Sequence, residues 1–294
     1  MEFIISFVIL HYKDIKSTDA CVRSILNMHG QEHIRIIIVD NDIQESEEDR
    51  RKLTERYKKY SAVTVLPIRE NGGFSYGNNC GYRFAREDQK ASFIVMANND
   101  IIFPQENFVD LIKDCYDTYS CDIIGPDIVQ RESGKHQNPM AERVRTAKEA
   151  EYTMRMNRMA AKYFSILYPV LYWKIKKQES EDGFYTKKAP EMYRQVQKNK
   201  VLYGACLIFT PSFVSAEEKA FWPETRFFYE EYILAKRCQD KGYETIYEPA
   251  VQVIHESGAA TQLSSRTVRN RIRFQVERIA EASEVYLNYL NFLH

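Results

Sequence analysis

Two long apolar runs near the start of the chain constrain the fold more than any other feature. Residues 3–10, FIISFVIL, and residues 33–40, HIRIIIVD, are rich in β-branched side chains and lack a regular alternation of apolar and polar positions. A strand that is apolar on both sides has both faces covered, which is the situation of a strand in a parallel sheet. The sequence therefore predicts a parallel sheet with helices packed on either side.

Helical and strand patterns alternate around these runs. Helices are expected at about 17–29, 45–60 and 75–87, and strands at 62–68 and 92–97. This alternation favours right-handed crossovers and a Rossmann-like, doubly wound, mostly parallel α/β sheet. Ligands of such sheets bind beyond the carboxyl ends of the strands.

The sheet pattern then stops and resumes. A region rich in Met, Tyr and Lys predicts a helical insertion at about 140–200. After it we expect a strand at 201–209, a helix at about 230–241, a pair of strands at 244–254, and one or two helices in the tail. We predict one domain over residues 1–262 and a C-terminal helical extension over 263–294.

Composition excludes several classes of protein. The 294 residues carry 41 Lys and Arg against 41 Asp and Glu, so the chain shows no sign of coating nucleic acid. Six scattered cysteines without a CxxC pair indicate buried thiols in a reducing compartment. The first apolar run lacks a basic leader, and no uncharged run of about 18 residues predicts a membrane span. We expect a cytoplasmic protein, with a peripheral position on the inner face of the plasma membrane left open.

Polar residues follow the apolar runs at the predicted carboxyl edge of the sheet. Asp40 and Asn41 end the second strand, and Asn98, Asn99 and Asp100 end the fourth. The sequence Asn98-Asn99-Asp100 is typical of an Asx turn. Alternatively, the Asp100 carboxylate is a ligand for Mg²⁺ or Mn²⁺ that bridges to a diphosphate, since such ions take only one or two carboxylates from a protein.

A glycine-rich segment precedes the third predicted helix, in RENGGFSYGNNCGYRFA at 69–85. Asn71 and Gly73 allow positive φ and close approach of the backbone to a ligand, and Ser75 is a candidate helix cap. Asn78, one turn into the helix, is expected at the same edge. The segment is neither a phosphate loop nor a dinucleotide motif, and a plain turn remains the alternative.

Two further segments carry candidate chemistry. Glu230 and Glu231 begin a predicted helix, where acidic residues are favoured by the helix dipole whatever their function. Because neighbouring residues lie about 100° apart around a helix, only one of the pair can point into a cleft as a general base. His255 ends a predicted strand, either as a hydrogen-bonded structural residue or as a partner of Mn²⁺ or a phosphate oxygen.

Seven segments in the right order together resemble a known family. They are ISFVILHY, IIIVDN, ENGGFSYGNNCGYRFA, ANND, YGACLIF, FFYEEYIL and VIHESG. The chain resembles the family 2 glycosyltransferases with the GT-A fold, especially the branch of bacterial rhamnosyltransferase-like and polysaccharide-assembly enzymes. The resemblance covers about 1–262, with a gap at the insertion.

The resemblance implies a metal-dependent glycosyltransferase of the hexosyltransferase type. Its donor would be a UDP- or dTDP-sugar, with Asp40 on the pyrimidine base and Asp100 and His255 on Mg²⁺ or Mn²⁺. Glu231 would be the catalytic base, with Glu230 as the other candidate. The remaining implied nucleotide-sugar contacts are Asn41, Asn71, Gly73, Asn78, Asn98, Asn99, Gly204 and Ala205.

Two departures from the family pattern concern the site. The DxD-type motif has Asn98 at its first position, which leaves one carboxylate for the metal. The base motif has Glu231 where Asp is commoner.

The resemblance implies an inverting transfer to a hydroxyl of a glycan or lipid-linked saccharide acceptor, in cell-surface polysaccharide synthesis. A catalytically inert nucleotide-sugar-binding subunit and a sugar-phosphate nucleotidylyltransferase are the alternatives. Residues 152–177 carry six basic and no acidic side chains. They predict either a helix pair that contacts anionic lipid or a helical lid over the site.

Overall fold

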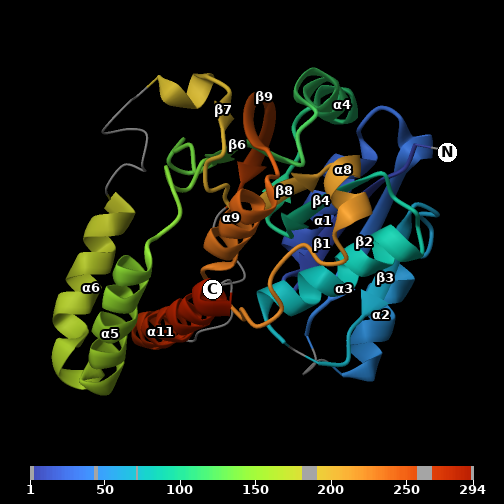
Figure 1. Cartoon of the computed structure of the whole chain (residues 1–294). Coiled ribbons are helices and arrows are strands. Elements are labelled where there is room, and N and C mark those ends of the chain that lie inside the picture. Colours follow the sequence, from blue (N-terminus) through green and yellow to red (C-terminus); the bar gives the residue numbers. More distant parts are fainter. Residues whose placement is uncertain (1–2, 43–45, 71, 181–190, 257–266, 293–294) are drawn as a thin grey trace.

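The two apolar runs at the start of the chain form neighbouring parallel strands inside one sheet (Figure 1). The computed structural model describes residues 3–42, 46–70, 72–180, 191–256 and 267–292. Within them the strands follow the order β3-β2-β1-β4-β8-β6-β9-β5, and β7 pairs with β9. The strands are β1 (Ile5–His11), β2 (Ile34–Asp40), β3 (Val63–Pro67), β4 (Phe93–Asn98), β5 (Ile101–Ile102), β6 (Ile123–Gln130), β7 (Gln197–Lys198), β8 (Cys206–Phe209) and β9 (Thr245–His255).

The four longest strand pairings of the described sheet are parallel. Strands β3, β2, β1 and β4 are parallel to one another, and β6 is parallel to β9. Strand β8 lies antiparallel between β4 and β6, so the residues that precede β8 meet the carboxyl ends of its neighbours. The prediction of a doubly wound, mostly parallel α/β sheet is confirmed.

Helices cover both faces of this sheet, which explains why the central strands are apolar on both sides. Phe7 points into the core with α1, α2 and α4, whereas Val8 points into the core with α3, α8 and α9, and both side chains are fully buried. The helices are α1 (Ile15–Leu26), α2 (Glu47–Tyr57), α3 (Phe74–Glu87), α4 (Phe108–Tyr119), α5 (Ala147–Lys162), α6 (Phe164–Ser180), α8 (Pro211–Ala216), α9 (Glu230–Lys241) and α11 (Val268–Phe292).

The strand pair predicted at 244–254 is wrong, because these residues form the single strand β9. The register with β6 shifts between Pro126 and Asp127, whose partners are Glu248 and Gln252. Pro249 lies within this irregularity and has no N–H for the ladder. The strand therefore bulges and continues in the same direction instead of turning back.

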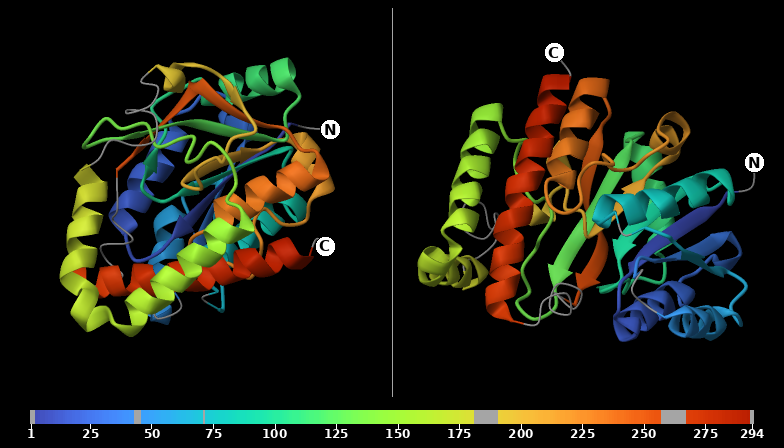
Figure 2. Two further views of the ribbon diagram at one scale, coloured as in Figure 1. Left: turned by 60° about the vertical axis from the view of Figure 1, so that its left-hand side comes forward. Right: turned by 90° about the horizontal axis from the view of Figure 1, so that it is seen from below.

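The predicted insertion is built around a pair of helices that pack with the C-terminal helix beside the sheet (Figure 2). Helix α5 begins with a capping box, in which Thr146 and Glu149 satisfy each other's backbone N–H groups. Arg158 of α5 forms an ion pair with Glu284 of α11 at 2.7 Å. Helix α11 also packs against α9 through Ile233 and other apolar side chains, so it joins the insertion to the helix that carries the acidic pair.

No helix among the described residues is both long and apolar enough to cross a bilayer.

Candidate active site

The polar residues predicted at strand ends do gather along the carboxyl edge of the sheet. His11 and Asp40 end β1 and β2 and are direct register partners. Asn98 ends β4, and its backbone N–H donates a hydrogen bond to the carbonyl of Ala205 at 2.9 Å. Gly204 and Ala205 thus belong to this edge because β8 runs antiparallel to β4.

The end of β2 presents buried oxygen acceptors that have no hydrogen-bond partner among the described residues. Asp40 Oδ1 accepts from the backbone N–H of Asp42 at 3.2 Å, whereas its Oδ2 has no hydrogen bond among the described residues. Oδ2 lies 3.7 Å from Nε of Arg50, and Asn41 Oδ1 is likewise buried without a partner in this part of the chain. Burial raises the pKa of the Asp40 carboxyl. A donor group of a ligand would satisfy these oxygens.

Asp100 and His255 come together although they are far apart in sequence. Strand β5 pairs antiparallel with β9, so Asp100 Oδ1 lies 3.4 Å from Nε2 of His255, and both residues are buried. The other ring nitrogen of His255, Nδ1, lies 2.7 Å from Oε1 of Gln137. Because the Gln137 oxygen accepts, this contact orients the His255 ring so that Nε2 faces the Asp100 carboxylate.

This pair fits a divalent cation. Two ligands at right angles, each about 2.1 Å from one ion, lie about 3.0 Å apart, close to the separation of the Asp100 and His255 atoms. Among the described residues, no group of three or more His, Cys, Asp or Glu side chains is placed to hold a metal ion. An ion held by Asp100 and His255 would therefore take its remaining ligands from water or substrate, as Mg²⁺ does beside phosphates.

Several expected contact residues have structural partners. The amide nitrogen of Asn99 donates to the Asp14 carbonyl at 3.2 Å and to Thr18 Oγ1 at 3.1 Å, at the start of α1. The amide nitrogen of Asn78 donates to the Phe74 carbonyl at 3.1 Å within α3. Asn71 lies outside the described residues.

The start of α3 is bound to the segment that leads into α9. Gly73 is the N-cap of α3, and its φ of +89° is a conformation that side chains disfavour. Ser75, expected as the cap, lies in the first turn of the helix, where its Oγ is 2.7 Å from Oγ1 of Thr225. The Asn79 amide donates to the carbonyl and accepts from the N–H of Phe221, both at 2.9 Å. These contacts fix the position from which α9 begins.

Both acidic residues at the start of α9 are buried. Glu231 Oε1 accepts from the backbone N–H of Gly204 at 3.3 Å, and a Cβ at Gly204 would approach this oxygen to 2.9 Å. Glu230 Oε2 has no hydrogen-bond partner in the described part of the chain. Burial raises the pKa of both carboxyls. The negative charge of Glu231 raises that of Glu230 further, while the Gly204 N–H opposes the rise for Glu231.

A cavity of about 580 Å³ opens onto this pair. Asn98, Gly204 and Ala205 line it from the sheet, and Glu230 and Glu231 line it from α9. The insertion and the C-terminal helix supply the remaining side, which includes Arg145, Thr153, Asn157, Leu171, Lys174, Ile175, Gln275, Val276 and Ile279. The insertion therefore contributes to the wall of the site, as a lid would.

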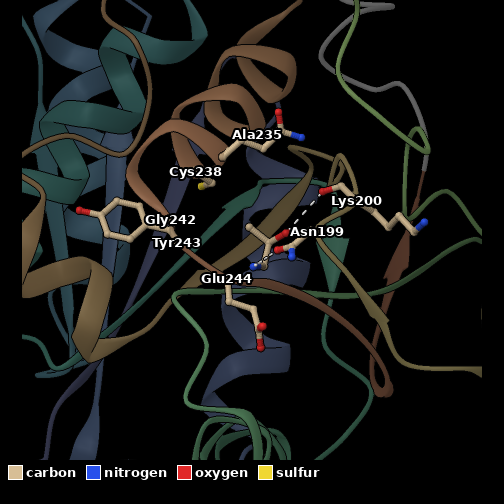
Figure 3. A pocket seen from close by; sticks show the side chains of 9 residues that line it. Asn199, Lys200, Ala235, Cys238, Gly242, Tyr243 and Glu244 are labelled. Atoms are coloured by element: carbon tan, nitrogen blue, oxygen red, sulfur yellow. Dashed lines mark hydrogen bonds between the residues drawn. The ribbon is translucent and has the colours of Figure 1, made fainter.

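A second cavity, of about 310 Å³, lies at the other end of α9 (Figure 3). It is lined by Cys238 and by residues at the start of β9. Two of its polar groups bond each other, since the Thr245 N–H donates to Asn199 Oδ1 at 3.2 Å. Burial raises the pKa of the Cys238 thiol to about 12, so this sulfur stays protonated and unreactive at neutral pH. We assign no chemistry to this cavity.

Sequence reasoning missed residues whose importance depends on tertiary contacts. His11 is buried beside Asp40, and its Nδ1 lies 2.7 Å from Oγ1 of Thr18. Its position at the end of the first apolar run was the available signal. Gln137, which orients His255, and Arg145, which lines the cavity, lie in irregular segments whose sequence gives no such signal.

Similarity to known proteins adds to this geometry. The family model for Glycosyl transferase family 2 matches residues 6–214. The crystal structure of S. aureus TarS 1-349 in complex with UDP-GlcNAc matches with a TM-score of 0.54 and 12% identity, over 95% of this chain and 65% of that one. A further crystal structure of S. aureus TarS 1-349 gives a TM-score of 0.50 and 11% identity, over 84% and 61%. This chain thus spans less than two thirds of these TarS chains. No curated protein sequence matches it.

At such low identity the TarS structures inform on the fold alone, and that fold is the GT-A type expected from the sequence. The family match covers more than two thirds of the chain. The chain belongs to glycosyl transferase family 2.

The buried acidic pair predicts an unusual dependence of stability on pH. A carboxyl whose pKa is raised by folding stabilises the folded state below the ordinary pKa of glutamate and loses that contribution as the pH rises through the folded value. Replacing Glu230 by Gln removes the cost of ionising it. We therefore expect Glu230→Gln to raise Tm at pH 8 by about 2–4 °C, roughly 1 kcal/mol, with a smaller rise at pH 5.

Thermal melts of both proteins across pH 5–8 test this expectation. Glu224→Gln, at an exposed position in the segment before α9, is the matched control and should show no such dependence. An equal Tm change at pH 5 and pH 8 would show that the pKa of Glu230 is the same in the folded and unfolded states.

Proposed function

We propose that this chain is an inverting glycosyltransferase that moves a sugar from a nucleoside-diphosphate sugar to a hydroxyl of a glycan or lipid-linked saccharide. The observation that carries the proposal is the position of Glu231. This buried carboxylate lines a large cavity together with Asn98 at the carboxyl edge of a GT-A sheet. A base in that position lies next to the carboxyl ends of the strands, which is where ligands of such sheets bind.

The donor side is supported by the unpartnered oxygens at the end of β2. Asp40 Oδ2 and Asn41 Oδ1 are acceptors, and the ring N–H of uracil or thymine is a donor that complements them. We propose a UDP- or dTDP-sugar as the donor. The TarS structure that shares this fold is a complex with UDP-GlcNAc, which favours UDP as the first nucleotide to test.

We propose that Asp100 and His255 hold Mg²⁺ or Mn²⁺ beside the diphosphate. Such an ion supplies charge stabilisation of the leaving group worth several kcal/mol. Gln137 serves this site by fixing the His255 ring, because its contact with Nδ1 keeps Nε2 directed at Asp100.

Glu231 is the better base of the acidic pair. Each carboxyl is stabilised in its ionised form by its own backbone N–H, but Glu231 has the Gly204 N–H in addition. The charge of Glu231 opposes the ionisation of Glu230, so Glu230 keeps its proton more readily. In the reaction, the acceptor hydroxyl gives its proton to Glu231 and its oxygen bonds to the anomeric carbon. The bond from that carbon to the diphosphate breaks on the opposite face, and the electron pair leaves with the diphosphate.

The alternatives fit less well. A nucleotidylyltransferase would need a glycine-rich basic loop after the first strand, and residues 11–20, HYKDIKSTDA, contain no glycine. An inert subunit would bind donor without transferring it, which the experiments below distinguish. The rhamnosyltransferase-like branch, the domain boundary at 262 and a role in cell-surface polysaccharide synthesis stay predictions.

Donor and metal binding are tested together by thermal shift with a panel of UDP- and dTDP-sugars in Mg²⁺, Mn²⁺ or EDTA. A donor at 100 times its Kd adds about 2.7 kcal/mol of stability, so we expect Tm to rise by about 5 °C or more. The rise should require metal and disappear in Asp100→Ala. The exposed Asp110→Ala on α4 is the matched control. A shift that persists in EDTA and in Asp100→Ala would overturn the metal assignment.

The base assignment is tested by turnover once a donor is known. Glu231→Gln should lower kcat about 10²- to 10⁴-fold, because general-base help is worth that much, while donor binding stays unchanged. Glu230→Gln is the paired comparison and should keep kcat within about tenfold of the unaltered protein. Near-normal turnover by Glu231→Gln, or the reverse order of the two variants, would exclude Glu231 as the base.

We also propose that the outer surface of the insertion rests on anionic lipid at the cytoplasmic side of a membrane. Helix α6 exposes Ile166, Val170 and Trp173 at i, i+4 and i+7, with Ile166 77% and Trp173 65% accessible. Exposed apolar side chains also follow one stripe of α5, at Tyr152, Met156, Met159 and the adjoining Tyr163. Lys162 at the end of α5 complements anionic headgroups.

Vesicle flotation tests the membrane contact directly. We expect the protein to float with vesicles that contain phosphatidylglycerol, and the double substitution Ile166→Ser and Trp173→Ser to reduce the bound fraction several-fold. Phe292→Ser, which removes an exposed apolar side chain from the end of α11, should leave it unchanged. Equal flotation of all three proteins, or none, would overturn the proposal.

A further inference from the structure

We propose that the acceptor carries an anionic group, a phosphate or a carboxylate, and that Arg145 and Lys174 of the insertion bind it inside the cavity that Glu231 lines. The inference deepens the proposed function and rests on it. Both cations line this cavity together with the acidic pair.

Arg145 is a half-buried guanidinium without a carboxylate partner among the described residues. Its Nη1 donates to Oγ1 of Thr153 at 2.9 Å and to the hydroxyl of Tyr229 at 3.0 Å, and both acceptors are neutral. Arg143, two residues earlier, shows the contrast, since it is exposed and forms a two-pronged ion pair with Glu149. A partly desolvated charge that lacks a counter-ion is costly unless a ligand supplies one.

The guanidinium is held in place before any ligand arrives. It lies over the Tyr229 ring at 5.2 Å and over the Tyr232 ring at 5.0 Å, both from ring centroid to Cζ. These cation–π contacts and the two hydrogen bonds fix the plane of the group. Both Nη1 hydrogens are engaged, and the Tyr232 side chain also accepts from the guanidinium. The five N–H groups of an arginine exceed these three contacts, and the planar fork that they form suits phosphate or carboxylate.

The acidic residues of the cavity do not serve as the missing counter-ions. The pKa values of Glu230 and Glu231 are raised by burial, and for Glu230 also by the neighbouring carboxylate, with no cation acting on either group. In the described part of the chain, Glu231 Oε1 accepts from the Gly204 N–H and Glu230 Oε2 has no hydrogen-bond partner, so neither carboxyl forms an ion pair with Arg145. Such separation suits an acceptor whose hydroxyl meets Glu231 while its anionic group meets Arg145.

Lys174 adds a second cation to the same cavity from α6. Its side chain is exposed and takes part in no ion pair within the described chain. A flexible ammonium beside a fixed guanidinium is a common way to bind phosphate, because the two groups supply charge and geometry separately. Rings from Tyr203, Tyr229 and Tyr232 lie along the cavity between sheet and insertion and offer apolar surface to the body of an acceptor.

The test is isothermal titration calorimetry on the full chain saturated with UDP or dTDP and Mg²⁺, so that the donor site is filled. The probes are glycerol 1-phosphate, glucuronate, and the neutral methyl glucoside. We expect one or both anions to bind and the neutral sugar not to. The phosphate and carboxylate probes distinguish the two kinds of acceptor.

Substitutions then locate the site. Arg145→Gln should weaken anion binding about tenfold or more, as expected for loss of a charge-assisted hydrogen bond, and Arg145→Lys should restore part of it. Lys174→Gln, at an exposed position, tests the same site should Arg145→Gln fail to fold. Arg155→Gln, an exposed arginine on α5 that pairs with Glu151, is the matched control. Nucleotide affinity should be unchanged in all of these variants.

The proposed function and the inference about the acceptor are overturned by different results. If neither nucleotide binds, the proposed function is overturned. If a nucleotide binds but neither anion does, or if the anions bind equally well to Arg145→Gln and Lys174→Gln, the inference about the acceptor is overturned.

Discussion

The candidate active site depends on the close approach of the α3 backbone to the segment before α9. A Cβ at Gly73 would lie 2.8 Å from the Cα of Arg226, and the N–H of Phe74 donates to the Arg226 carbonyl at 2.7 Å. This approach joins the glycine-rich segment on the donor side to the turn that delivers Glu230 and Glu231. A residue larger than glycine would separate the two halves of the site, whatever its own chemistry.

This arrangement buries the acidic pair at the start of α9 and gives its two carboxyls different surroundings. Two adjacent carboxyls are buried, and Glu231 accepts a hydrogen bond from the Gly204 backbone in addition to the local backbone contact that each carboxyl makes. The two carboxyls therefore have different surroundings, and under the proposed function this difference divides the role of base from that of a protonated neighbour. Gly204 is central to this division, because it supplies the N–H and leaves room for the Glu231 side chain.

The sequence predicted features that have a local or periodic signature. Doubly apolar strands identified the sheet, and polar residues at their ends placed Asp40 and Asn98 at its carboxyl edge. Contacts between distant segments left no such signature. Ser75 meets Thr225 across 150 positions, and Arg145 meets Tyr229 across 84. For the same reason the structural role of Asn99 at the start of α1 could not be separated from ligand binding by sequence alone.

The family match ends at residue 214, before the acidic pair, His255 and α11. The family match therefore does not extend to these residues, and under the proposed function the base has to be argued from geometry. The same holds for the acceptor, because the cavity wall that faces α9 comes partly from α11, which packs against both α5 and α9. One long helix thus couples the insertion to the carboxylates, so the shape of this cavity and the position of the acidic pair are set by a single packing arrangement.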